Sequence, residues 1–355
     1  MTAEATRKYS FETGVYRPPS EGGSYSLLIR VTRNCPWNRC TFCGMYKQEE
    51  FSLRSPQEVN SDIDSMAAVC NGLKDFSWQL DYGGEINREA AIAMINNDPE
   101  LNASPWFVMI YNWLLAGGKT AFLQDADSLT MKSDQLVDIL THLRKTLPSL
   151  NRVTSYARSK TIAQKPAEEL MKICTAGLDR LHVGLETGDK ALLKKIKKGI
   201  TAQGHIKAGK KAMEAGFQLS EYWMPGLGGK AMWESHAENT ARVLNEINPH
   251  YIRSRPFFPS PGTPLCKEHD RGEFQPLSPS EQLIELKLMM AELDFTSRVC
   301  FDHAANYWRG KNGRLLFSQG YEGYKFPEQK PLVLRLLEEG IEAQEGIPRA
   351  PILSL

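Results

Sequence analysis

The chain has 355 residues, of which 41% are hydrophobic and 24% are charged, a composition typical of a globular protein with a buried core. Its 43 lysines and arginines nearly balance 42 aspartates and glutamates, so the net charge of +1 gives no argument for a general attraction to nucleic acid or anionic membranes. The N-terminus lacks the apolar core of a signal peptide, and the longest apolar run, 106–118, is shorter than the roughly 20 residues that span a bilayer, so a cytoplasmic protein is expected.

Six β-strands, each followed by a helical pattern, are predicted between about residues 25 and 265. The strands are predicted at 24–32, 120–129, 151–158, 178–188, 217–229 and 250–258. The first helix begins at Pro56, inside a capping box that Ser55 and Glu58 form. This alternation predicts an α/β fold with a parallel sheet, and six repeats are enough for an open, partial TIM-like (β/α)6 barrel but not for a closed eight-stranded one.

Three segments lie outside the βα alternation. Residues 75–119, between the first helix and the second strand, contain helical patterns and are predicted to be an inserted helical unit. Residues 1–24 are predicted to be an N-terminal extension of the barrel domain, 25–265. Residues 266–355 are predicted to be a mostly helical C-terminal extension. We expect the insertion and the C-terminal extension to close over the mouth of the barrel.

Three of the seven cysteines fall within nine residues, in the sequence NCPWNRCTFC. Cys35, Cys40 and Cys43 could be buried thiols, halves of disulfides, ligands of a zinc ion or ligands of an iron–sulfur cluster. An odd number of cysteines without framework spacing argues against disulfides, and thiolates this close together favour a metal over buried thiols. Zinc usually takes four closed ligands, whereas three thiolates leave one iron of a four-iron cluster open, and only the context can decide.

The surrounding sequence resembles the radical S-adenosylmethionine superfamily. The common signature of that superfamily is CxxxCxxC with an aromatic residue before the last cysteine, a place that Phe42 fills here. The first gap in this chain is four residues instead of three. The resemblance covers about two-thirds of the chain, and residues 16–47 look like a bacterial branch with a CxxxxCxxC motif.

The resemblance implies a mechanism and its partners. Cys35, Cys40 and Cys43 would hold a [4Fe–4S] cluster whose fourth iron binds S-adenosylmethionine. One electron from the reduced cluster would split the sulfonium and give a 5′-deoxyadenosyl radical, which would take a hydrogen atom from a small organic substrate. The electron donor would be a protein such as flavodoxin or ferredoxin. No membrane or nucleic-acid partner is expected.

The resemblance also assigns residues at the ends of the predicted strands to the cofactor. Relatives end the second strand in Gly-Gly-Glu, and the corresponding residues here are Asp125, Ala126 and Asp127. Asp127, or alternatively Asp125, would therefore bind the methionine ammonium, unless one of them only caps the next helix. Arg158 would pair with the methionine carboxylate, or it is an ordinary surface arginine.

Later strands supply the remaining candidates. Glu186 would bind the ribose hydroxyls, or it belongs to a buried ion pair. The MPGLGG turn at 224–229 would approach the adenine, or it is a tight turn without a ligand. Arg253 and Arg255 would hold an anionic group, or they line a salt-bridge network. The full set of expected cofactor-binding residues is Phe42, Gln124, Asp125, Asp127, Arg158, Glu186, Met224, Gly226, Arg253 and Arg255.

One segment of the tail, DHAANYW at 302–308, carries polar and aromatic side chains. It is predicted to begin a helix that Asp302 caps, or alternatively to form a lid that contacts the substrate.

Three functions are compatible with the sequence. The first is a radical enzyme with an unidentified, small organic substrate. The second is a non-catalytic, cluster-containing binding protein, like the haem chaperones that belong to the same superfamily. The third is an interaction module that zinc stabilises. Release of 5′-deoxyadenosine separates the first from the second, and iron and sulfide analysis separates both from the third.

Overall fold

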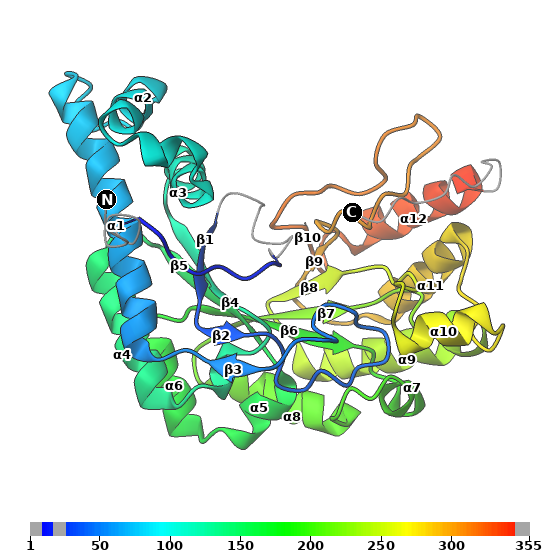
Figure 1. Cartoon of the computed structure of the whole chain (residues 1–355). Helices are drawn as coiled ribbons and strands as arrows, with labels where there is room; N and C mark the ends of the chain where they lie inside the picture. Colours follow the sequence, from blue (N-terminus) through cyan, green and yellow to red (C-terminus); the bar gives the residue numbers. More distant parts are fainter. Residues whose placement is uncertain (1–8, 17–25, 345–355) are drawn as a thin grey trace. The chain divides into compact units, whose positions relative to one another are not determined.

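The computed structural model describes residues 9–16 and 26–344 (Figure 1). The predicted N-terminal extension is thus described only at 9–16, and residues 24 and 25 of the first predicted strand lie outside the described residues. The chain forms two compact units. The first contains 1–36, 48–182 and 214–218, and the second contains 37–47, 183–213 and 219–355.

The six predicted strands are all present. They are β1 (Ser26–Arg30), β4 (Thr120–Gln124), β5 (Arg152–Ala157), β6 (Arg180–Glu186), β7 (Gln218–Trp223) and β8 (Tyr251–Ser254). Two short strands, β9 (Arg298–Cys300) and β10 (Tyr324–Lys325), were not predicted. The eight strands form a sheet in the order β1-β4-β5-β6-β7-β8-β9-β10, and the mostly parallel sheet confirms the predicted fold class.

Local sequence signals set the helices of the first unit. α1 (Pro56–Gln79) begins at the predicted capping box and buries an apolar face that includes Val59, Ile63 and Met66. The segment predicted as an insertion contains two helices, α2 (Arg88–Asn97) and α3 (Pro105–Leu115). Both helices contact α1. α4 (Ser133–Thr146) contacts α1, and α6 (Ala167–Thr175) contacts α4. The shorter elements are β2 (Thr32–Arg33), β3 (Ser52–Leu53), η3 (Pro99–Ala103), η4 (Ser128–Thr130) and α5 (Ser159–Gln164).

The second unit contains the later helices. They are α7 (Lys190–Lys195), α8 (Ala202–Glu214), α9 (Gly229–Ile247), α10 (Pro264–Asp270), α11 (Pro279–Glu292) and α12 (Lys330–Gln344). α11 begins at a second capping box, formed by Ser278 and Glu281, and contacts both α9 and α12. The prediction of a helix that starts at Asp302 is wrong. Residues 302–308 form a turn followed by irregular structure, and Asp302 makes an ion pair with Arg253. No helix within the described ranges has the length and hydrophobicity needed to cross a membrane.

Candidate cofactor site

The three clustered cysteines lie on the irregular loop that follows β2, and all three are partly exposed. Cys35 belongs to the first unit, and Cys40 and Cys43 belong to the second. Among the residues that the structure describes, no three His, Cys, Asp or Glu side chains are gathered into a metal-binding group. The donor set nevertheless fits an iron–sulfur cluster, because three accessible thiols share one short loop, whereas Cys70 and Cys300 are buried.

Backbone contacts fix the second half of this loop. The amide of Thr41 donates to Ile196 O at 3.0 Å, just after α7, and the amide of Leu265 donates to Thr41 O at 3.0 Å. Phe42, the aromatic residue of the motif, packs against a buried apolar cluster that includes Met224. Two predicted site residues, Phe42 and Met224, therefore belong to the same apolar packing in the second unit.

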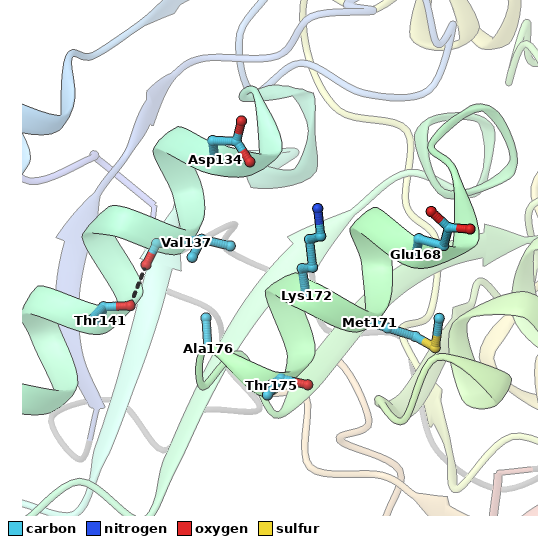
Figure 2. A pocket seen from close by; sticks show the side chains of 8 residues that line it. All are labelled: Asp134, Val137, Thr141, Glu168, Met171, Lys172, Thr175 and Ala176. Carbon is cyan, nitrogen blue, oxygen red and sulfur yellow. Dashed lines mark hydrogen bonds between the residues drawn. The ribbon is translucent and has the colours of Figure 1, made fainter.

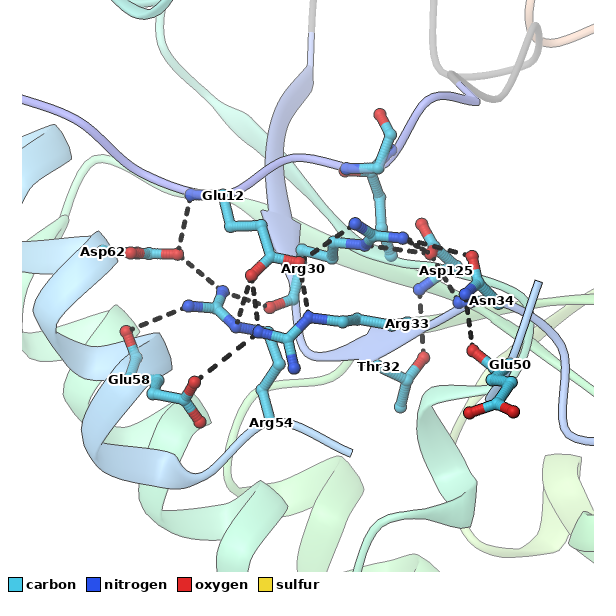
Figure 3. A network of polar contacts seen from close by, with 12 residues as sticks. Glu12, Arg30, Thr32, Arg33, Asn34, Glu50, Arg54, Glu58, Asp62 and Asp125 are labelled. Atoms are coloured by element: carbon cyan, nitrogen blue, oxygen red, sulfur yellow. Dashed lines mark hydrogen bonds and ion pairs between the residues drawn. The ribbon is translucent and has the colours of Figure 1, made fainter. Parts of the chain in front are cut away.

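A network of charges surrounds Asp125, which follows β4 (Figure 3). Arg30 donates to the Asp125 carboxylate at 2.7 Å, and the backbone amide of Asn34 donates to it at 2.8 Å. The second carboxylate oxygen of Asp125 is buried and meets no hydrogen-bond partner within the described chain. Asp125 is thus held at the ends of β1 and β4 through one of its two carboxylate oxygens.

The N-terminal segment, defined here as residues 9–16, crosses these strand ends in the first unit (Figure 3). Its Gly14 accepts from and donates to the side-chain amide of Gln124, at 3.3 and 2.8 Å. A Cβ added to Gly14 would lie 1.9 Å from Asp125 Oδ1, so only glycine can pass this closely. Gln124 and Asp125, both predicted to bind the cofactor, are covered by this segment.

Glu12 anchors the N-terminal segment to three arginines (Figure 3). The distances from its carboxylate to these side chains are 2.6 Å for Arg33, 3.0 Å for Arg30 and 3.4 Å for Arg54. The hydrogen bond from Arg33 is the main cause that lowers the pKa of Glu12 below its ordinary value, and burial opposes it. Glu12 could not be identified from the sequence, because its partners are spread over three separate segments.

Asp127 is fully buried, and it does not cap a helix with its side chain. It occupies the N-cap position of η4, yet its carboxylate makes no capping hydrogen bond among the described residues. Thr161 Oγ1 donates to Asp127 Oδ2 instead, and Asp127 Oδ1 meets no hydrogen-bond partner within the described ranges. Burial raises the pKa of Asp127 to about 6, although Thr161 and the charge of Arg158 oppose the rise. The alternative of a helix-capping aspartate is therefore wrong for Asp127.

Glu186 makes an ion pair at the end of β6. Its carboxylate accepts from Lys198 Nζ at 2.8 Å, as the alternative to ribose binding predicted. Glu221 on β7 is fully buried close to both, and neither of its carboxylate oxygens meets a hydrogen-bond partner in the described part of the chain. Burial raises the pKa of Glu221 well above its ordinary value, and the charge of Glu186 raises it further. Glu221 was not predicted as a site residue, although a lone acid in the strand FQLSEYW is visible in the sequence.

The glycine turn after β7 is packed against α11. Gly226 has a φ of +85° and its amide donates to the buried carboxylate of Glu285. A Cβ at Gly226 would lie 2.8 Å from Gln282 Nε2, so this position requires glycine for both its conformation and its space. Burial raises the pKa of Glu285 to about 8.

The two arginines predicted around β8 differ in their surroundings. Arg253 is fully buried, makes an ion pair with Asp302, and lies over the rings of Tyr251 and Tyr321. These contacts match the predicted alternative of a salt-bridge network. Arg255 is half-buried, and its charge helps burial to lower the pKa of His303 to about 4. Asp302, which was expected to cap a helix, makes an ion pair with Arg253 instead.

Two hollows on the surface lie apart from these residues. One of about 630 Å³ lies on α4 and α6, and its lining includes Val137, Thr141 and Met171 (Figure 2). None of its lining residues is a predicted site residue. The other, of about 440 Å³, includes Trp37 of the cysteine loop and three lysines around α7.

The fold of this chain is similar to that of a solved structure. No protein-family model matches the sequence. A radical S-adenosylmethionine methyltransferase from Kitasatospora setae, determined with cobalamin and a [4Fe–4S] cluster bound, aligns with 96% of this chain and 65% of its own, at a TM-score of 0.51 and 15% identity. The fold is that of the radical S-adenosylmethionine enzymes. The predicted resemblance is confirmed at this level.

Two further proteins are similar to parts of this chain. Methylornithine synthase aligns with 91% of this chain and 73% of its own, at a TM-score of 0.46 and 15% identity. The tRNA uridine(34) acetyltransferase of Methanocaldococcus infernus is 25% identical over an alignment 214 residues long, which covers 54% of this chain. The match spans only 38% of the length of that curated relative.

Proposed function

We propose that the chain is a radical S-adenosylmethionine enzyme in which Cys35, Cys40 and Cys43 hold a [4Fe–4S] cluster. The observation that carries this proposal is the set of three partly exposed thiols on one loop of a chain with this fold. When bound, the cluster and S-adenosylmethionine supply a 5′-deoxyadenosyl radical that removes a hydrogen atom from a substrate. The substrate that we propose is a small organic molecule.

Residues of the first unit would bind the methionine part of the cofactor. Asp127 and Asp125 each keep a buried carboxylate oxygen that meets no hydrogen-bond partner in the described ranges, and an ammonium group would satisfy such an oxygen. Asp127 remains our first choice, with Asp125 as the alternative. Arg158 would pair with the methionine carboxylate, and its charge already acts on Asp127.

Residues of the second unit would bind the nucleoside part. Glu186 would accept hydrogen bonds from the ribose, and its ion pair with Lys198 would hold it in place. The backbone of the 224–229 turn would face the adenine, with Gly226 fixed by Glu285. We assign the contact with an anionic group to Arg255, because the charge of Arg253 is already paired with the carboxylate of Asp302.

The proposal is tested with protein purified and reconstituted under anaerobic conditions. We expect about four irons and four sulfides per chain and release of 5′-deoxyadenosine from S-adenosylmethionine upon reduction by dithionite. Cys40→Ala should lose both the iron and the cleavage. Cys266→Ala is the matched control, because Cys266 is also partly exposed but lies on α10, and it should keep both. A cluster without release of 5′-deoxyadenosine would favour the non-catalytic binding protein.

A further inference from the structure

A group of exposed basic residues surrounds Trp37 on the cysteine loop. We call Trp37, Arg39, Lys190, Lys194 and Lys197 the Trp37 patch. Trp37 and the three lysines line the hollow of about 440 Å³, and Arg39 lies over the Trp37 ring at 5.1 Å from its centroid. All five residues belong to the second unit, as do Cys40 and Cys43.

The patch is a built feature and not a chance gathering of side chains. Trp37 Nε1 donates to Lys197 O at 2.8 Å, which joins the cysteine loop to the chain that follows α7. Gly199, with a φ of +82°, lies against the same indole, and a Cβ there would come within 2.5 Å of the ring. The patch is therefore attached directly to the loop that carries Cys40 and Cys43.

The charge of the patch is not neutralised. Within the described chain, Lys190, Lys194 and Lys197 make no ion pair, whereas Lys195 contacts Glu268 at 3.6 Å. A lysine in the last turn of a helix interacts favourably with the helix dipole, which accounts for the position of Lys194. Lys190 is the first residue of α7, where a positive charge opposes the dipole, so helix stability does not explain it.

We propose that the Trp37 patch is the docking surface for an acidic electron-donor protein. The inference rests on the proposed function, since a cluster held by the cysteine loop must receive an electron. One electron would pass from a reduced flavin or iron–sulfur protein to the oxidised cluster, and the donor would leave oxidised by one electron. Complementary charge around a partly apolar centre speeds such an encounter and orients it, and the part of the Trp37 indole that lines the hollow supplies the apolar centre.

A nucleic acid would also be attracted by basic residues, but the patch suits it less. Proteins that bind single strands stack bases on aromatic rings. The indole of Trp37 already has Arg39 over its ring and Gly199 against it, so less of the ring is left for a base. We therefore commit to an acidic protein, and nucleic-acid binding becomes an outcome of the test.

The test compares two sets of charge reversals. The patch variant carries Lys190→Glu, Lys194→Glu and Lys197→Glu. The matched control carries Lys207→Glu and Lys210→Glu, which are exposed lysines of α8 outside the patch. Circular dichroism shows whether the patch variant folds. If it does not, a milder variant with glutamine at the three patch positions replaces it.

Two readouts are measured with a bacterial flavodoxin as the probe. By biolayer interferometry, the patch variant should bind flavodoxin about tenfold more weakly or worse, and binding of the parent should weaken as salt rises. With reduced flavodoxin as donor, cleavage of S-adenosylmethionine by the patch variant should fall by a similar factor, while dithionite should drive it at the parent rate.

Several results would overturn the docking proposal. Equal flavodoxin binding by the parent and the patch variant is one, and equal losses in the control variant is another. Tight, patch-dependent binding of a single-stranded oligonucleotide without binding of flavodoxin would assign the patch to nucleic acid instead. If dithionite drives no cleavage by the parent, the proposed function fails, and the binding measurement still decides whether the patch holds an acidic protein.

Discussion

Replacing Asp127 by asparagine should stabilise the protein at neutral pH while it weakens binding of S-adenosylmethionine. The Asp127 carboxylate is fully buried, and the hydrogen bond from Thr161 does not offset the loss of water. A rise in pKa from 3.8 to about 6 corresponds to about 3 kcal/mol of folding free energy at 25 °C. Asparagine has nearly the same shape, can still accept from Thr161 and cannot ionise, so the variant avoids this cost.

The sign of the pH dependence follows from the raised pKa of Asp127. Below pH 3.8 the carboxyl is protonated in both the folded and the unfolded states, and the parent and the variant should be about equally stable. Between pH 3.8 and about 6 the parent loses stability relative to Asp127→Asn, and above this range the full difference is present. A chain of 355 residues should then differ by about 4 °C in melting midpoint, if it unfolds in one transition.

Differential scanning calorimetry of the free protein at pH 4 and pH 7 measures this difference. Asp125→Asn is the control of opposite sign, because the Asp125 carboxylate pairs with Arg30 at 2.7 Å and its removal should lower the midpoint. Isothermal titration with S-adenosylmethionine then tests the functional role. If Asp127→Asn melts at or below the parent temperature at pH 7, or if the difference does not grow with pH, the Asp127 carboxylate does not destabilise the folded protein.

Three further changes test other parts of the structure. Glu12→Gln should speed amide hydrogen exchange of residues 9–16 at pH 7, because the ion pairs with the arginines are lost. In the parent, the same loss of protection should begin as the pH falls below 4.5, the ordinary pKa of this glutamate. Unchanged protection would refute the anchoring role. Asp302→Asn leaves the buried guanidinium of Arg253 uncompensated and should cost about 3–5 kcal/mol in denaturant unfolding, so a loss below about 1 kcal/mol would count against a buried pair. Glu221→Gln should raise the melting midpoint at pH 7, since it removes an unsolvated carboxylate, and a lower midpoint would show that the acid is satisfied.

Much of the fold could be predicted from local signals in the sequence. The capping boxes at Ser55 and Ser278 each involve residues three positions apart, so the sequence alone indicates where α1 and α11 begin. The six strands were predictable because each is followed by a helical pattern, and this alternation indicates a parallel sheet. By contrast, β9 and β10 have three and two residues, and such short strands carry no periodic signal.

Long-range pairing explains what the sequence could not show. Asp302 was expected to cap a helix, but its partner is Arg253, 49 residues earlier, and no local rule predicts that pair. Likewise, Glu12 meets three arginines only because β1, β2 and the end of β3 bring them together. Glu221 is different, because an acid inside an apolar strand is visible in the sequence and could have been named as a candidate.

The central claim is that Cys35, Cys40 and Cys43 leave one iron of a cluster open to S-adenosylmethionine. Electron–nuclear double resonance of the reduced, reconstituted protein tests it most directly, with S-adenosylmethionine labelled by ¹⁵N at its amino group. We predict a ¹⁵N hyperfine coupling that shows the amino nitrogen bound to iron, and its loss when the cofactor is omitted. A cluster signal that the labelled cofactor leaves unchanged, or the absence of any cluster signal, would contradict the account.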